Sequence, residues 1–167
     1  MENLENRKKD HIELAFKSQT LAVERDPRFY YEPMVSAHPD GQLPPLPFLG
    51  KTLRCPLWVS SMTGGTKEAG TINRNLARAC REFGMGMGLG SCRSLLYSAE
   101  YLDDFKMREI IGEEQSFWAN LGIAQIEKMV NDKEVARVED LVHTLEADGL
   151  IIHVNPMQEW FQMEGDV

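Results

Sequence analysis

The 167-residue sequence lacks the features that would place it outside the soluble globular class. No apolar run approaches the ~20 residues of a membrane-spanning helix, and the opening residues, MENLENRKKDHIEL, contain no apolar signal-peptide core. The three cysteines, Cys55, Cys80 and Cys92, include no CxxC pair, which indicates free thiols in a reducing compartment. We therefore expect a cytoplasmic protein with no membrane partner, whose cysteines are small buried side chains.

Basic charge is also scarce, and the formal net charge of −8 is unevenly distributed. Residues 100–148 contain 13 acids and 5 bases, whereas residues 26–99 contain 5 acids and 8 bases. An acidic run of this kind usually forms solvated helical faces, and it argues against nucleic acid as a partner. The locally basic part of the chain can still hold a small anion.

Composition divides the chain near residue 56. Seven of the eight prolines lie in residues 26–56, which predicts a long irregular connection with short extended pieces such as residues 51–54. Residues 4–25 have a partly helical pattern. We expect residues 1–56 to form a helical and proline-rich segment that covers the site, and residues 57–167 to form the main domain.

Strand and helix patterns alternate in that main domain. The expected strands are PLWVSSM, GMGMGLGS, SFWANLG and LIIHV. Between them lie an amphipathic helix at about residues 68–83, a mixed helical region at about 95–111, the segment AQIEKMV, and a helix through residues 135–145. This alternation predicts a parallel α/β sheet with crossover helices.

Two architectures fit such a sheet, an open doubly wound sheet and a (β/α)8 TIM barrel, and both bind ligands at the carboxyl ends of their strands. All four strand ends are polar or glycine-rich, which favours a barrel because its whole carboxyl rim forms one site. A barrel typically needs ~250 residues. We therefore expect the N-terminal half of a TIM barrel, about four βα units, from a longer chain. A half barrel that pairs with another is the alternative.

Three motifs near the strand ends have both a functional and a structural interpretation. TGGT at residues 63–66 either lets a ligand approach the backbone or forms a simple turn in which Thr66 caps the next helix. GMGMGLGSCR at residues 84–93 lacks the GK[ST] of a P-loop, and its glycines are typical of tight strand packing. Ser91 and Arg93 suit an anionic oxygen. RKKDH at residues 7–11 is either a solvated helix start or a diphosphate clamp.

HVNPMQE, at residues 153–159, is the most specific motif. His153 and Asn155 alternate along the strand and should share a face. Asn155-Pro156 then ends the strand, and Gln158 and Glu159 are expected on the following loop. A single glutamate beside amides suits Mg²⁺, which takes one or two carboxylates together with substrate phosphates. The alternative is a polar loop with Glu159 in solvent.

Taken in order, RKKDH, SSMTGGT, GLGSCRSLL, ANLG and HVNPMQE resemble type 2 isopentenyl-diphosphate delta-isomerase, from about residue 7 to the last residue. The resemblance implies a flavin-dependent barrel of isoprenoid biosynthesis that interconverts isopentenyl and dimethylallyl diphosphate. It also implies FMN, NADPH as the reductant, Mg²⁺, and a homo-oligomer, either a tetramer or an octamer. In this family the reduced flavin is thought to move the protons, so no side chain is assigned as catalytic.

The resemblance further implies binding roles for twelve residues, with Ser91 in two of the three groups. Those expected to bind substrate are Arg7, Lys8, Ser91, Arg93, His153, Asn155 and Gln158. Those expected to bind FMN are Ser61, Met62, Thr63, Ser91 and Asn120. Glu159 is the expected metal ligand. Cys92 departs from the family, because many relatives have glutamine at that place.

Two other functions remain open on the sequence alone. One is a different FMN-dependent TIM-barrel oxidoreductase. The other is a non-catalytic half barrel that binds a phosphorylated ligand. In barrels of this kind the phosphate site usually follows strands seven and eight, so we expect the 167-residue chain alone to bind FMN poorly and to have little activity.

Overall fold

The computed structural model describes residues 44–61, 63, 64 and 66–161, together with residues 12–14, 16, 17, 24 and 28. Arg7, Lys8 and Met62 lie outside the described residues. The chain divides into two compact units, Met1–Pro44 and Pro45–Val167. In the first unit, residues 12–14 and 16–17 are helical. The second unit contains the two sheets and all the predicted site residues that the structure describes.

A two-stranded hairpin opens the second unit. Strands β1 (Leu46–Phe48) and β2 (Lys51–Leu53) pair antiparallel. The loop between them places Leu49 at φ 46° and Gly50 at φ 82°, and such left-handed conformations suit a two-residue hairpin turn. The extended piece predicted at residues 51–54 is confirmed, whereas β1 was missed because its sequence, LPF, contains a proline. The compact unit therefore begins twelve residues before the division expected at residues 56 and 57.

A four-stranded parallel sheet follows, and its strands lie side by side in chain order, β3-β4-β5-β6. The strands are β3 (Trp58–Val59), β4 (Gly86–Gly88), β5 (Phe117–Gly122) and β6 (Gly149–His153). All four predicted strands are confirmed, although β3 and β4 are shorter than expected. Residues 118–122 of β5 pair in register with residues 149–153 of β6.

Helical segments connect each strand to the next. They are α2 (Lys67–Phe83), η2 (Arg93–Leu96), η3 (Leu102–Asp104), α3 (Arg108–Ile111), α4 (Ile123–Asn131) and α5 (Ala136–Thr144). The helix predicted at residues 68–83 is confirmed, as are its two ends. Thr66 Oγ1 accepts a hydrogen bond from the Ala69 amide at 3.1 Å, and Gly84 ends the helix at φ 73°.

A further helix, α6 (Pro156–Trp160), follows β6. The prediction that Gln158 and Glu159 lie on a loop is therefore wrong. Pro156 occupies the first turn, where its fixed φ favours a helix start and its missing N–H costs nothing. Among the described residues, no helix is both long enough and apolar enough to cross a membrane.

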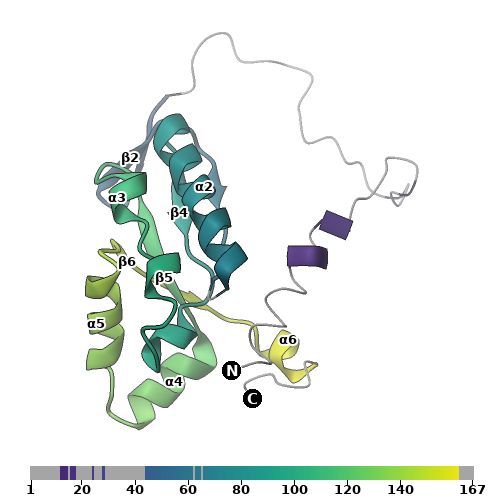
Figure 1. Ribbon diagram of the computed structural model, residues 1–167, viewed down its shortest axis with the longest axis vertical. Helices are drawn as coiled ribbons and strands as arrows, with labels where there is room; N and C mark the ends of the chain where they lie inside the picture. Colours follow the sequence, from purple (N-terminus) through teal and green to yellow (C-terminus); the bar gives the residue numbers. More distant parts are fainter. Residues whose placement is uncertain are drawn as a thin grey trace. The chain divides into compact units, whose positions relative to one another are not determined.

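The core lies between one face of the sheet and its helices (Figure 1). Alternate residues of β5, Phe117, Ala119 and Leu121, are fully buried on that face. Cys80 of α2 and Cys92 are also fully buried, as predicted, whereas Cys55 is half-buried. The acids of α4 and α5, among them Glu127 and Asp140, are exposed, which confirms the solvated acidic faces.

The opposite face of the sheet pairs glycines with tryptophans. A Cβ atom on Gly86 would lie 2.1 Å from the Trp58 ring, and one on Gly149 would lie 2.5 Å from the Trp118 ring. The predicted packing role of the glycines in GMGMG is therefore confirmed at Gly86. An apolar cavity of about 490 Å³ lies against this face, lined by the two tryptophans and by residues of the hairpin such as Phe48.

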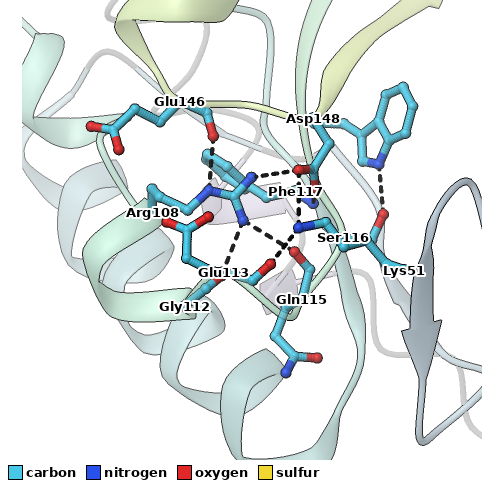
Figure 2. A network of polar contacts seen from close by, with 10 residues as sticks. Lys51, Arg108, Gly112, Glu113, Gln115, Ser116, Phe117, Glu146 and Asp148 are labelled. Carbon is cyan, nitrogen blue, oxygen red and sulfur yellow. Dashed lines mark hydrogen bonds and ion pairs between the residues drawn. The ribbon is translucent and has the colours of Figure 1, made fainter.

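At the amino ends of β5 and β6, Arg108 is the centre of a polar network (Figure 2). Arg108 is 5% exposed. Its guanidinium pairs with Asp148 Oδ1 at 3.0 Å. It also donates to the carbonyl oxygens of Glu146, Gly112 and Gln115, at 2.8, 3.0 and 3.1 Å respectively.

Asp148 extends this network to the neighbouring strand and to the hairpin. Its Oδ2 accepts a hydrogen bond from the Phe117 amide at 2.8 Å. Its Oδ1 lies 3.5 Å from Lys51 Nζ, and Lys51 also donates to the carbonyl oxygen of Glu113. The network thus joins β2, α3, β5 and the residues just before β6 (Figure 2).

Candidate functional site

Parallel pairing brings the carboxyl ends of β3, β4, β5 and β6 to one edge of the sheet. The predicted site residues that the structure describes lie in or directly after these strand ends. They are Ser61, Thr63, Ser91, Arg93, Asn120, His153, Asn155 and Glu159. Gln158 lies in α6, and its side chain is outside the described part of the chain. The described candidates therefore share a place in the topology, on the carboxyl side of the four strands.

The segments after β3 and β4 are in close contact with each other and with β5. A Cβ atom on Gly90 would lie 2.3 Å from the Thr63 carbonyl oxygen, so only glycine lets these two segments approach. The Cys92 amide donates to the Asn120 carbonyl oxygen at 2.8 Å. The backbones around Thr63, Gly90 and Asn120 thus form one connected unit.

Two buried side-chain oxygens in this unit have no hydrogen-bond partner among the described residues, Thr63 Oγ1 and Asn120 Oδ1. Their residues are 4% and 3% exposed. Leaving a buried acceptor unpaired costs about 1–3 kcal/mol, so buried polar groups are nearly always paired. A ligand that donates hydrogen bonds here would remove that cost. Ser94 Oγ and Gln115 Oε1 are the other such atoms in the described chain.

Ser61 presents its hydroxyl on the sheet face opposite the helices. Its Oγ lies 3.0 Å from the position of a Cβ on Gly88, and Ile151 Cδ1 lies 2.7 Å from the same position. Any side chain at Gly88 would therefore displace Ser61 or Ile151. The absence of a side chain there lets the hydroxyl lie against the strand.

The TGGT motif has a structural role at the two of its residues that can be assigned. A Cβ atom on Gly64 would lie 2.2 Å from the buried ring of Phe105, so the missing side chain makes room for the core. This packing explains Gly64 without a ligand, and ligand approach at Gly64 stays a prediction. Thr66 caps α2, as in the alternative interpretation, and Gly65 lies outside the described residues.

The segment after β4 has polar residues on both sides of a buried cysteine. Ser91 and Arg93 are half-buried, and Ser91 Oγ accepts a weak hydrogen bond from the Arg93 amide at 3.4 Å. Cys92 is fully buried, and its thiol donates to the Gly90 carbonyl oxygen at 3.4 Å. Cys92 therefore belongs to the core beneath the site.

The HVNPMQE motif ends β6 and forms the first turn of α6. His153 is exposed, whereas Asn155 and Glu159 are half-buried. Asn155 Nδ2 donates to Glu159 Oε1 at 2.8 Å, which directs the Asn155 amide toward the carboxylate. In the described part of the chain, no three His, Cys, Asp or Glu side chains are grouped as in a metal site. A cation at Glu159 would therefore need other ligands, such as phosphate oxygens.

Sequence reasoning missed two structural contributors to this site, Gly90 and Trp118. Gly90 allows the close contact with Thr63. It is the final glycine of GMGMGLG, and its position just after the strand could have indicated a close approach between two backbones. Trp118 lies two residues before Asn120 and so on the same face of β5. Its indole nitrogen donates to Ser116 Oγ at 2.7 Å.

No protein-family model matches the chain. Among curated proteins it is similar to "Isopentenyl-diphosphate delta-isomerase" of Pelodictyon phaeoclathratiforme, with 36% identity over 96% of this chain and 45% of that protein. The protein of the same name from Nostoc sp. is 37% identical over 98% of this chain and 47% of its own length. That from Deinococcus radiodurans is 43% identical over 71% of this chain. The chain spans about half the length of the first two.

Proposed function

We propose that the chain is the N-terminal half of a flavin-dependent, type 2 isopentenyl-diphosphate delta-isomerase. The observation that carries this proposal is the similarity over nearly the whole chain to proteins named for that reaction. Those names state the isomerisation and no cofactor. The flavin-dependent type rests on the motifs and on the chemistry of the site.

The order of the strands supports a half barrel. Each strand is added next to the preceding one in the same direction. When every connection between neighbouring strands is right-handed, all the connecting helices lie on the same face of the sheet. The helices of this chain share a single core cluster, as such an arrangement requires. A doubly wound sheet reverses direction at a switch point. Four strands in chain order fit the first half of a barrel.

The site residues fit FMN. Thr63 Oγ1 and Asn120 Oδ1 are buried acceptors without partners among the described residues, and a flavin ring carries N–H donors. Ser61 adds a hydroxyl on the face opposite the helices. When it is bound and reduced, a flavin supplies both a proton donor and a proton acceptor next to an alkene. Within this chain the three side chains would orient the ring, and the buried strand ends would exclude water.

The diphosphate and its Mg²⁺ would bind beside this flavin. Arg93 brings a guanidinium, which can form paired, charge-assisted hydrogen bonds with phosphate oxygens. Ser91 and His153 can donate to the same oxygens, and Glu159 would hold the cation. Charged phosphates enter a partly dry site only when they are paired. Reduction of FMN by NADPH and assembly into tetramers or octamers belong to the same proposal.

The test uses the protein purified from its native cells, whose intact mass would be measured first. Conversion of isopentenyl to dimethylallyl diphosphate would then be assayed with FMN, NADPH and Mg²⁺. We expect turnover without stoichiometric NADPH oxidation, which separates an isomerase from an oxidoreductase. Glu159→Gln should abolish turnover, and Glu139→Gln, at an exposed position of α5, should not. A native protein that binds FMN but does not isomerise the substrate would refute the proposal.

A further inference from the structure

The side chain of Asn155 makes an unusual hydrogen bond for its position. Asn155 directly precedes α6 and is its N-cap residue, yet it makes no side-chain capping bond. An asparagine at this place normally accepts a hydrogen bond from a backbone N–H of the first turn. Here its amide instead donates to Glu159 Oε1 at 2.8 Å.

Two hydrogen bonds join the same pair of residues. In addition to the side-chain bond, the Glu159 amide donates to the Asn155 carbonyl oxygen at 3.1 Å. Pro156 fixes the backbone between them at the start of the helix. Both side chains are half-buried, so the carboxylate is held by its neighbour at the edge of the site.

A hydrogen-bonded carboxylate can still bind a cation. An ionised carboxylate has about four lone-pair sites, and one amide donor uses one of them. In metal sites, ligating carboxylates are commonly held by such donors, and loss of a donor typically weakens metal affinity by about 10–100-fold. Glu159 and Asn155 have this arrangement.

We propose that Asn155 is a positioning residue, whose amide holds the Glu159 carboxylate in the orientation in which it binds a divalent cation. This inference rests on the metal role given to Glu159 in the proposed function. It leaves the expected diphosphate contact of Asn155 as a prediction, because the amide nitrogen carries two hydrogens and the bond to Glu159 uses one of them.

Binding of Mn²⁺ together with inorganic diphosphate, whose oxygens supply the further ligands that the cation needs, tests this role without an activity assay. The 167-residue chain would be titrated with Mn²⁺ in a fixed excess of inorganic diphosphate, with bound Mn²⁺ measured by equilibrium dialysis, and Mg²⁺ should displace the bound ion. We expect Glu159→Gln to abolish the site and Asn155→Ala to raise its Kd about 10–100-fold. Saturating Mn²⁺ should restore full occupancy in Asn155→Ala, whose thermal midpoint should match that of the wild type. The control Asn131→Ala, at the exposed end of α4, should bind as the wild type does.

A second measurement needs no variant to fold. In the wild-type chain, bound Mn²⁺ should broaden the side-chain amide resonance of Asn155 at lower concentrations than that of Asn131. If Asn155→Ala binds Mn²⁺ normally while Glu159→Gln does not, or if the Asn155 signal is not preferentially broadened, the positioning role is refuted. If Glu159→Gln binds Mn²⁺ normally, or the wild type binds none, the metal role of Glu159 fails as well. Isomerase activity of the native protein would still decide the proposed function separately.

Discussion

At the amino end of the parallel sheet, Arg108 is 5% exposed and bonds to three carbonyl oxygens and one carboxylate. At the carboxyl end, Asn120 is 3% exposed, and its Oδ1 has no partner among the described residues. The two side chains are buried to nearly the same degree. Arg108 belongs to α3, just before β5, and Asn120 belongs to β5 itself. They differ in whether the protein itself supplies their partners.

This difference separates a stabilising end of the sheet from the end at which we propose binding. In parallel α/β folds, polar residues at the amino ends of strands usually serve stability, and those at the carboxyl ends serve function. Gln115 is a partial exception at the amino end. Its Oε1 is buried without a partner in the described chain, although its backbone carbonyl oxygen accepts a bond from Arg108. The amino end therefore depends mainly on Arg108.

The largest expected effect comes from Arg108→Met, which breaks the amino-end network. The substitution leaves Asp148 without its main cationic partner and removes the donor from three carbonyl oxygens. Because the Asp148 side chain is 19% exposed, the ion pair is only partly buried, and we expect a loss of about 2–4 kcal/mol from the lost pair and from the buried Gln115 carbonyl oxygen that loses its donor. The stacking of the guanidinium on the Phe117 ring, at 5.2 Å, is lost as well. Urea denaturation would measure the loss in free energy of unfolding.

Arg78→Met is the matched control for that prediction. Arg78 is exposed on α2, and its side chain donates to Asn75 at 3.2 Å. We expect a change within about 0.5 kcal/mol, as for ordinary surface substitutions. Equal losses in Arg78→Met and Arg108→Met would show that the network has no special role in stability.

The next substitution, Asn120→Leu, should raise the free energy of unfolding, because it removes an unpaired acceptor from the carboxyl end of the sheet. Leucine has a similar size and shape, and it no longer leaves Oδ1 buried without a partner. We expect the free energy of unfolding to rise by about 1–3 kcal/mol, the cost of an unsatisfied buried group. Flavin binding by the native protein, followed by fluorescence, should weaken at the same time. A clear loss of stability would mean that Asn120 has a structural role instead.

The sequence predicted the four strands and their helices because their hydrophobic periods are regular. Met87, Phe117, Ala119 and Leu121 face the core as the alternation requires. It also placed the site residues at strand ends, since parallel strands end together. It missed α6 because Asn155-Pro156 was interpreted only as the end of a strand, although proline also favours the first turn of a helix.

Tertiary contacts account for the roles that the sequence did not show. The role of Gly64 depends on Phe105, which is 41 residues away in the chain, and no local pattern shows that contact. The Arg108 network was missed for the same reason, because its partners come from separate segments. An arginine within a short helical stretch looks like an ordinary surface residue until the fold buries it.

A smaller effect is expected from Lys51→Ala, which removes the link between the hairpin and the amino-end network. Lys51 Nζ lies 3.5 Å from Asp148 Oδ1, and the lysine side chain is 25% exposed. Partly exposed ion pairs typically contribute up to about 1 kcal/mol, so the loss should be well below that of Arg108→Met. Because salt screens such pairs, urea denaturation at low and high ionic strength should show a smaller difference from the wild type at high ionic strength.

The smallest effect is expected from Asp104→Asn, near the amino end of α2, and it should depend on pH. Burial raises the pKa of Asp104 above its ordinary value of 3.8, and Asp103 raises it further, while Arg74 lowers it. Since the folded pKa is the higher one, the protonated form stabilises the fold below pH 3.8, and that contribution is lost as the pH rises through the folded pKa.

Asparagine stays neutral at every pH and has the same shape, which matters because Asp104 Oδ1 packs tightly against Gly70. Asp104→Asn should therefore be slightly more stable than the wild type at pH 7 and equal to it at pH 3. Urea midpoints of both proteins at the two pH values would measure this. A variant that is less stable than the wild type at pH 7 would show that the charged carboxylate stabilises the fold, most directly through Arg74, and that burial does not dominate its pKa.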